Sequence, residues 1–448
     1  MASAAEQLAS NLNWGAIGKA TELKKRLWFT VGALVVFRVG AYIPVPGVDP
    51  HALAEIFQQN AGGIAGLLDV FSGGSIGRMS VLALSIMPYI SASIIMQILT
   101  TVVPSLEALK KEGEAGRKKI NQYTRYGTVI LAAFQAYGIA VGLESQVATA
   151  GPVVIDPGVF FRFVTVVTLV GGTLFLMWLG EQITARGVGN GVSLIIFAGI
   201  VAALPGALIQ TLELGRTGAL SALFIIALAV GVIVVVAVVV FMETAQRRII
   251  VQYPKRQVGN RMYGGEASHL PLKINTSGVI PPIFASSLLL FPATIASFQG
   301  NTGEPGWIQW ISTYLGHGQP LYLLAYVGLI VFFCFFYTTV VFNPNDTADN
   351  LKKNGGFVPG IRPGKNTAEY LEYILNRLTV VGALYLSAVC ILPELLIARG
   401  GVPFYFGGTS LLIVVSVTLD TVTQIQAHLL AHQYEGLIKK ARLRGRGR

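Results

Sequence analysis

The sequence has few charged residues for its length. Only 12% of its 448 residues are Asp, Glu, Lys or Arg, whereas 53% are hydrophobic. Soluble domains usually carry about 25% charged residues, so this composition excludes an ordinary soluble core and indicates a polytopic membrane protein. The net charge of +11 would also suit a nucleic-acid-binding protein, but the basic residues occur in short clusters between apolar runs rather than along one soluble face.

Cysteine and the common catalytic motifs are also scarce. Cys334 and Cys390 lie inside apolar runs, where we expect small buried side chains rather than a disulfide or metal ligands. There is no His-Glu-x-x-His motif, and His428 and His432, one helical turn apart, have no third ligand near them in sequence. We therefore expect no enzymatic activity, no cofactor and no metal site.

The glycine-rich segment GVGNG, from Gly187 to Gly191, superficially resembles a phosphate-binding loop. It lacks the preceding strand and the downstream Lys-Ser/Thr pair that such a loop needs. The pattern therefore favours close helix packing or a tight helix start.

Long apolar runs predict ten membrane-spanning helices, because about 20 apolar residues cross the hydrocarbon core of a bilayer. The predicted spans are 27–46, 78–100, 122–143, 157–179, 187–209, 218–242, 274–297, 319–341, 374–396 and 404–428.

The basic residues alternate between the two sides of these spans. One side collects Lys19–Arg26, Lys110–Lys119, Arg247–Arg261, Lys352–Lys365 and the tail Lys439–Arg448. The loops of the opposite side contain only Arg216 and Arg399 as basic residues. Because cytoplasmic loops attract Lys and Arg, both termini are predicted to be cytoplasmic.

Two of the predicted cytoplasmic loops are long, residues 243–273 and 343–373. The first alternates loosely around Gly and Pro, as a protruding hairpin would, and the second has the Asn, Pro and Gly content of an ordered loop. Solvated connectors that simply follow the charge rule remain an alternative interpretation.

The stretch AGLLDVFSGGSIGRMS, residues 65–80, interrupts the pattern of spans. Residues 64–71 could form a helix of about 12 Å, which is under half of the roughly 30 Å hydrocarbon core and cannot cross it. Arg78 is predicted to open the next full span.

Ionisable residues within the spans leave an ion-coupled transporter as a rival function. The candidates are Arg38, Glu181, Glu394 and Asp420, of which only Asp420 is expected to lie deep in the membrane. Ile86 with Ile90, and Val192 with Ile196, form aliphatic pairs four residues apart, and the pattern alone favours lipid-facing positions for them.

Five long blocks carry a family resemblance, and they are FSGGSIGRMSVLALSIMPYISASIIMQIL, MWLGEQITARGVGNGVSLIIFAGIV, HLPLKINTSGVIPPIFASSLLLFPATIASF, FNPNDTADNLKKNGGFVPGIRPG and VPFYFGGTSLLIVVSVTLD. On the basis of these blocks, nearly the whole chain resembles the bacterial SecY family, whose members are the central subunits of the Sec protein-conducting channel. The resemblance implies an all-α membrane protein whose ten transmembrane helices form two pseudo-symmetric five-helix halves around an hourglass pore, with a short re-entrant plug helix.

The resemblance also implies a division of the chain and a set of site residues. The halves would be 27–209 and 210–428, between a cytoplasmic segment 1–26 and a basic tail 429–448, with the plug at about 64–74. The implied pore ring is Ile86, Ile90, Val192, Ile196, Ile283 and Ile413. The implied plug residues are Ile64, Leu67, Leu68, Phe71, Gly73 and Gly74. Polar residues of the lateral gate would be Ser91, Gln97 and Asn275, on helices beginning near Arg78 and Lys273. The implied docking residues are Lys255, Arg256, Arg261, Arg362 and Lys365.

The partners and location follow from the same resemblance. The implied partners are SecE and SecG subunits, the SecA ATPase, the ribosome, preprotein signal sequences and membrane lipids. The implied location is the bacterial inner membrane. The expected function is to pass unfolded preproteins across that membrane and to release apolar segments laterally into lipid.

Overall fold

The structure is a computed structural model of the chain. It describes residues 20–445, except 60–68, 70–71, 145, 149–150, 219–220, 254–255, 259–260, 264–266, 299–318 and 401–407.

Each of the ten predicted spans corresponds to a helix. The ten helices are α3 (Thr21–Gly40), α6 (Met87–Val102), α8 (Glu114–Glu144), α9 (Val159–Arg186), α10 (Gly191–Arg216), α11 (Ala222–Thr244), α12 (Ile280–Phe298), α14 (Pro320–Val341), α16 (Lys365–Gly400) and α17 (Gly408–Gly445). By length and composition alone, seven of the described helices can cross a membrane. The number is eight if α6 and the short α7 (Pro104–Lys111), which meet at a bend of 97°, count as one span.

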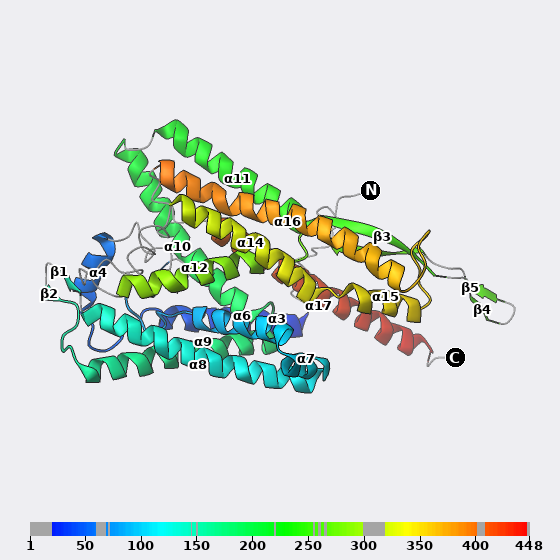
Figure 1. Cartoon of the computed structure of the whole chain (residues 1–448), viewed down its shortest axis with the longest axis horizontal. Helices are drawn as coiled ribbons and strands as arrows, with labels where there is room; N and C mark the ends of the chain where they lie inside the picture. The colour runs from blue at the N-terminus through cyan, green and yellow to red at the C-terminus, as the bar shows by residue number, and fades with distance from the viewer. Residues whose placement is uncertain are drawn as a thin grey trace.

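Shorter elements occupy the two ends of the elongated bundle (Figure 1). One end carries α4 (Pro50–Gln59) and the small antiparallel pair β1 (Val147–Ala148) and β2 (Gly151–Pro152). The opposite end carries α7, α15 (Pro344–Lys353) and a hairpin that projects beyond the helices. The elements α7, β3 and α15, which contain predicted cytoplasmic basic clusters, therefore lie at the same end.

The projecting hairpin confirms the expected structure of the first long loop. Strand β3 (Gln246–Gln252) pairs antiparallel with β6 (Ala267–Lys273), and β4 (Arg256–Val258) pairs with β5 (Arg261–Tyr263) farther out. Ile249 and Val251 of β3 are buried whereas Ile250 between them is exposed, which is the alternation of a strand with one covered face.

The second span begins later than the sequence indicated. Residues 75–86 form turns and a single bridge, so Arg78 does not open the helix, which begins at Met87. Met79 and Ser85 have φ angles of 43° and 51°, a left-handed conformation that a right-handed helix cannot contain. Pro88 then occupies the first turn of α6, where proline is well tolerated.

The helix of the seventh span also begins late, at Ile280 rather than near residue 274. Pro281 and Pro282 are its next two residues, and proline is compatible with a first helical turn because the N–H that it lacks has no partner there. Asn275 consequently precedes α12 instead of lying on it. The first span differs in the other direction, since α3 begins at Thr21 rather than at residue 27.

The main hydrophobic cluster of the described residues joins both expected halves of the chain. Fully buried members are Phe37 of α3, Ile200 of α10, Ile330 of α14 and Leu412 of α17. A second cluster packs α4 against α8 and α9 through residues such as Leu53, Ala136 and Leu169. These clusters fix the helices that carry the candidate site.

Candidate pore and cytoplasmic docking surface

The six residues of the expected pore ring lie in one hydrophobic cluster. Ile86, Ile90, Ile196 and Ile413 are buried members of the main cluster, and Val192 and Ile283 are partly buried and pack against it. They come from four helices, because Ile86 caps α6, which contains Ile90, and the others belong to α10, α12 and α17. Because four of the six side chains are buried and two are partly buried, the structure does not support the lipid-facing positions that the pattern alone favoured.

Gly180 and Gly191 allow α9 and α10 to pack closely beside Val192. A Cβ added to Gly191 would lie 1.9 Å from the carbonyl oxygen of Gly180 on α9, so only glycine allows the two backbones to approach this closely. Asn190 caps α10, since its side-chain oxygen accepts hydrogen bonds from the backbone N–H groups of Val192 and Ser193. The GVGNG segment is thus a tight helix start with close packing.

Side chains from three other helices hold the same turn. The hydroxyl of Thr184 on α9 donates to the Gly180 carbonyl (2.9 Å) and accepts from the Gly191 N–H (2.8 Å). The Val188 N–H donates to the hydroxyl of Thr30 on α3. The Gly189 N–H donates to the side-chain oxygen of Gln424 on α17 at 2.8 Å. The start of α10 is therefore held by α3, α9 and α17 together.

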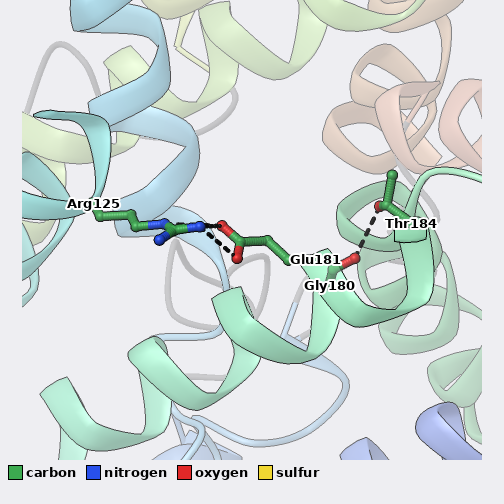
Figure 2. Close-up of polar contacts among 4 residues, drawn as sticks. All are labelled: Arg125, Gly180, Glu181 and Thr184. Carbon is green, nitrogen blue, oxygen red and sulfur yellow. Dashed lines mark hydrogen bonds and ion pairs between the residues drawn. The ribbon is translucent and has the colours of Figure 1, made fainter. Parts of the chain in front are cut away.

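Next to this turn, Arg125 of α8 forms a bidentate ion pair with Glu181 of α9, as Figure 2 shows together with the Thr184 contact. The Arg125 Nη2 lies 2.8 Å and 2.7 Å from the two carboxylate oxygens. The charge of Glu181, one of the candidates for ion coupling, is balanced by this arginine.

Asp420, the main candidate for ion coupling, has an exposed side chain in this chain, and its depth in the membrane stays a prediction. It lies on α17, a long helix whose described backbone continues well beyond the predicted span. No group of three or more His, Cys, Asp or Glu side chains with metal-binding geometry occurs among the described residues. The side chain of Glu394 is outside the described part of the chain.

The plug residues Ile64, Leu67, Leu68 and Phe71 lie outside the described residues. Gly73 and Gly74, which end this segment, are described and have φ angles of 68° and 84°. Gly73 is buried, and it lies between α3 and α10.

The expected gate helices α6 and α12 are neighbours in the structure. Ser91 and Gln97 lie on α6, are partly buried, and the Gln97 side-chain oxygen has no hydrogen-bond partner among the described residues. Asn275 is buried and donates to the Glu243 carboxylate (2.7 Å) at the end of α11 and to the Gly278 carbonyl (3.1 Å). The amino-acid sequence alone gave no signal for the Asn275–Glu243 contact.

The two long loops that the charge pattern predicts to be cytoplasmic form one packed body. The backbones of Gln252 and Phe357 exchange two hydrogen bonds of 2.9 Å and 3.0 Å. A hydrophobic cluster beneath them joins both strands of the hairpin to the second loop and to the first turns of α16, through Ile249, Leu272, Val358, Leu371, Ile374 and Leu375. These loops are therefore more than solvated connectors.

Arg362 is exposed on this body, between two glycines with positive φ, Gly360 (83°) and Gly364 (104°). Its carbonyl accepts a hydrogen bond from the Thr367 hydroxyl (2.9 Å), which fixes the loop to the start of α16. Lys365 opens that helix and lies 3.9 Å from Glu369. Arg256 and Arg261 belong to β4 and β5, and Lys255 is outside the described residues.

Comparison with known proteins shows what this chain is similar to. The SecY family model matches residues 80–422. The protein translocase subunit SecY of Rickettsia conorii is 58% identical over 423 residues, which cover 94% of this chain and 97% of that protein. A solved protein-conducting channel has a TM-score of 0.67 at 20% identity, covering 91% of this chain and 92% of that one. Canine Sec61 in a ribosome-channel complex from the endoplasmic reticulum has a TM-score of 0.64 at 20% identity, with the same coverage.

Proposed function

The chain belongs to the SecY family of protein translocase subunits, and from that premise we propose how its residues divide the work of a protein-conducting channel. It is a multi-pass protein of the bacterial inner membrane with a helical channel fold. The observation that carries the proposal is that six aliphatic residues from four helices belong to one hydrophobic cluster and none of them is exposed.

We assign the seal of the channel to Ile86, Ile90, Val192, Ile196, Ile283 and Ile413. Branched apolar side chains offer no charge to hold an ion, and a ring of them can exclude water when empty. Dispersion contacts do not depend on the sequence of the passing chain, so the same ring can close around many unfolded polypeptides. Residues 64–71 would act as a plug, and Ser91, Gln97 and Asn275 would lie at the lateral gate.

The cytoplasmic body is the proposed docking surface for the partners that drive transport. Arg362 is its central residue, because an exposed guanidinium on a glycine-fixed loop can make bidentate contacts to carboxylate or phosphate. The family likeness supports SecA and the ribosome as partners, SecE and SecG as companion subunits, and signal sequences and lipids as ligands of the gate. The common end of the basic elements supports cytoplasmic termini.

The SecY relatives are protein translocase subunits, which does not fit an ion-coupled transporter, the rival function that the sequence left open. It would require gradient-driven uptake through Asp420, whereas a channel requires SecA, ATP and a secretory substrate. The pairing of Glu181 with Arg125 favours the channel.

Reconstitution of the double variant Ile86→Ser, Ile413→Ser tests the proposed seal. We expect a several-fold rise in resting ion conductance in planar bilayers, with preprotein translocation retained, because hydroxyl groups let water occupy the constriction. The control is Ile95→Ser on α6, whose side chain is exposed. If the double variant and the control had the same resting conductance, the assignment of these residues to the seal would be wrong.

A further inference from the structure

The turn that precedes α10 contacts α17, the helix that carries Ile413. The Gly189 N–H donates to the side-chain oxygen of Gln424 at 2.8 Å. Gly189 has a φ of +90°, and a Cβ added to it would lie 3.3 Å from the hydroxyl oxygen of Thr421. Such a φ favours glycine, and the absence of a side chain lets the turn approach α17 closely. Two residues of α17, one helical turn apart, therefore meet a single glycine of the turn.

One face of α17 connects this contact to the proposed ring. Its residues, at intervals of four, four and three, are Ile413, Val417, Thr421 and Gln424. Ile413 and Val417 are buried in the main hydrophobic cluster, to which Ile196 of α10 also belongs. The helices α10 and α17 pack against each other. From Ile413 to Gln424 the rise is about 16 Å at 1.5 Å per residue, so one continuous helix links a ring residue to the contact with the turn.

An apolar cluster lies beside the hydrogen bond. Leu23 of α3, Val188 of the turn and Leu429 of α17 are buried in it, and Leu27 and Ile425 pack against them. Burial of apolar surface is not directional, so this cluster holds α17 near the turn without selecting one rotation or register. A hydrogen bond accepts only a narrow range of distances and angles. The Gln424 bond therefore adds the directional contact that the cluster lacks.

On the side of α10 the turn is fixed. Hydrogen bonds to Thr30 of α3 and Thr184 of α9 hold the turn at the start of the helix. Val192 is the second residue of α10, and Ile196 lies one turn farther along it. A shift of α17 relative to the turn would consequently shift Ile413 relative to these two ring residues.

We propose that Gln424 is a positioning residue, which fixes the register of α17 against the turn and so sets where Ile413 lies relative to Val192 and Ile196. The proposal rests on the proposed function, because it assumes that these residues form the seal. Gln424 is exposed, so its substitution leaves no cavity in the core. Loss of one neutral hydrogen bond corresponds to about a two- to tenfold change in the equilibrium between two positions of the helix.

The test uses the full-length chain reconstituted with its companion subunits in planar bilayers, and measures resting ion conductance. Gln424→Met removes the acceptor at similar side-chain size and is expected to raise the conductance several-fold. Gln424→Glu keeps an oxygen that can accept from the Gly189 N–H and is expected to restore most of the seal. The control is Thr423→Val, which is exposed and whose hydroxyl donates to the Leu419 carbonyl of its own helix. It should keep the parent conductance.

Amide hydrogen exchange over residues 188–194 gives a second readout. Exchange is expected to be faster in Gln424→Met than in Gln424→Glu or Thr423→Val, because the Gly189 N–H loses its acceptor only in the first variant. Preprotein translocation in matched vesicles is expected to be retained in all three variants.

The variant Ile86→Ser, Ile413→Ser, measured beside these, separates failure of the positioning role from failure of the proposed seal. If that variant leaks, but Gln424→Met keeps the parent conductance or leaks no more than Gln424→Glu, then Gln424 is not a positioning residue and the seal assignment stands. If the Ile86→Ser, Ile413→Ser variant keeps the parent conductance, the seal assignment is wrong and the positioning role is wrong with it.

Discussion

The centre of the membrane domain and the cytoplasmic body place their apolar and polar groups in opposite ways. At the centre, the six aliphatic residues of the proposed ring belong to one hydrophobic cluster, and hydrogen bonds hold one of their helices at the start of α10. In the cytoplasmic body, the aliphatic residues lie inside as a core and the guanidinium of Arg362 is exposed.

This difference teaches which contacts each region can make. Apolar contacts scarcely depend on the sequence of a passing chain, whereas a charged group on a fixed loop selects a partner of matching charge and geometry. The centre is therefore suited to a variable cargo and the cytoplasmic body to specific partners. Substitutions in one region are therefore expected to change its function and leave the function of the other region intact.

The largest effect is expected for Arg362→Glu, which should abolish SecA-driven translocation and leave resting conductance unchanged. A reversed charge on the docking loop faces a partner surface that fits a cation, and the loss of one member of a desolvated pair commonly costs about 2–5 kcal/mol or more. The measurement is SecA ATPase activity with a preprotein substrate. Lys353→Glu, exposed on α15 of the same body, is the control and should change that activity less than about twofold. Normal stimulation by the Arg362 variant would exclude this residue as the docking contact.

A large effect on stability is expected for Gly191→Ala at the membrane centre. The new Cβ would meet the Gly180 carbonyl at 1.9 Å, so α9 and α10 must separate, and overpacking of this kind costs about 1–3 kcal/mol or more. Thermal unfolding of the purified complex measures the loss. Gly206→Ala on the same helix, where nothing lies within 4 Å of the added Cβ, should be neutral or slightly stabilising. Equal melting temperatures for the two variants would show that the close approach of the backbones is unnecessary.

A smaller effect is expected at the boundary between the two regions, for Asn275→Ala. The substitution leaves the Glu243 carboxylate without its amide donor, which should cost about 1–3 kcal/mol in the free energy of unfolding and loosen the start of α12. The looser helix should also accept defective signal sequences. Thr276→Val, at the adjacent partly buried site, removes only a hydroxyl that donates to the Lys273 carbonyl and should change both properties less. Unaltered selectivity in the Asn275 variant would separate this residue from the gate.

The smallest effect is expected for the Arg125–Glu181 pair, which lies near the ring but is partly exposed. A double-mutant cycle with Arg125→Ala and Glu181→Ala should give a coupling of about 0.2–1 kcal/mol, because water and salt screen exposed pairs. Resting conductance should stay at the parent value in all three variants. A coupling of several kcal/mol would mean that this pair, and not only the turn at Gly191, holds α9 in place.

The sequence predicted the features that depend on local composition. Each apolar run corresponds to a helix, and alternation with Gly and Pro predicted the projecting hairpin. The start of α6 was misplaced because left-handed backbone at Ser85, an ordinary residue, has no clear sequence signal. Run length alone does not show which face of a helix is covered, so it gave no signal that the side chain of Asp420 is exposed.

Contacts between distant segments could not be predicted. The Gly189–Gln424 hydrogen bond joins residues 235 positions apart, and the Arg38–Gly73 bond depends on how α3 crosses α10. The ring residues were available only through family resemblance, since the aliphatic pairs by themselves favoured a lipid-facing interpretation. In the structure, Ile86, Ile90 and Ile196 are buried and Val192 is partly buried in the main cluster, which the pattern alone did not predict.

The most direct test of the central claim, that the six aliphatic residues surround the path of the polypeptide, is crosslinking to a preprotein arrested in transit. Single cysteines would replace Ile86 and Ile413, with Ile95 and Thr418, exposed on the same two helices, as control sites. The proposed ring predicts that both ring positions crosslink to the arrested chain and that the control positions do not. Crosslinking at the control positions with none at Ile86 and Ile413 would contradict the ring and return the aliphatic pairs to the lipid-facing interpretation.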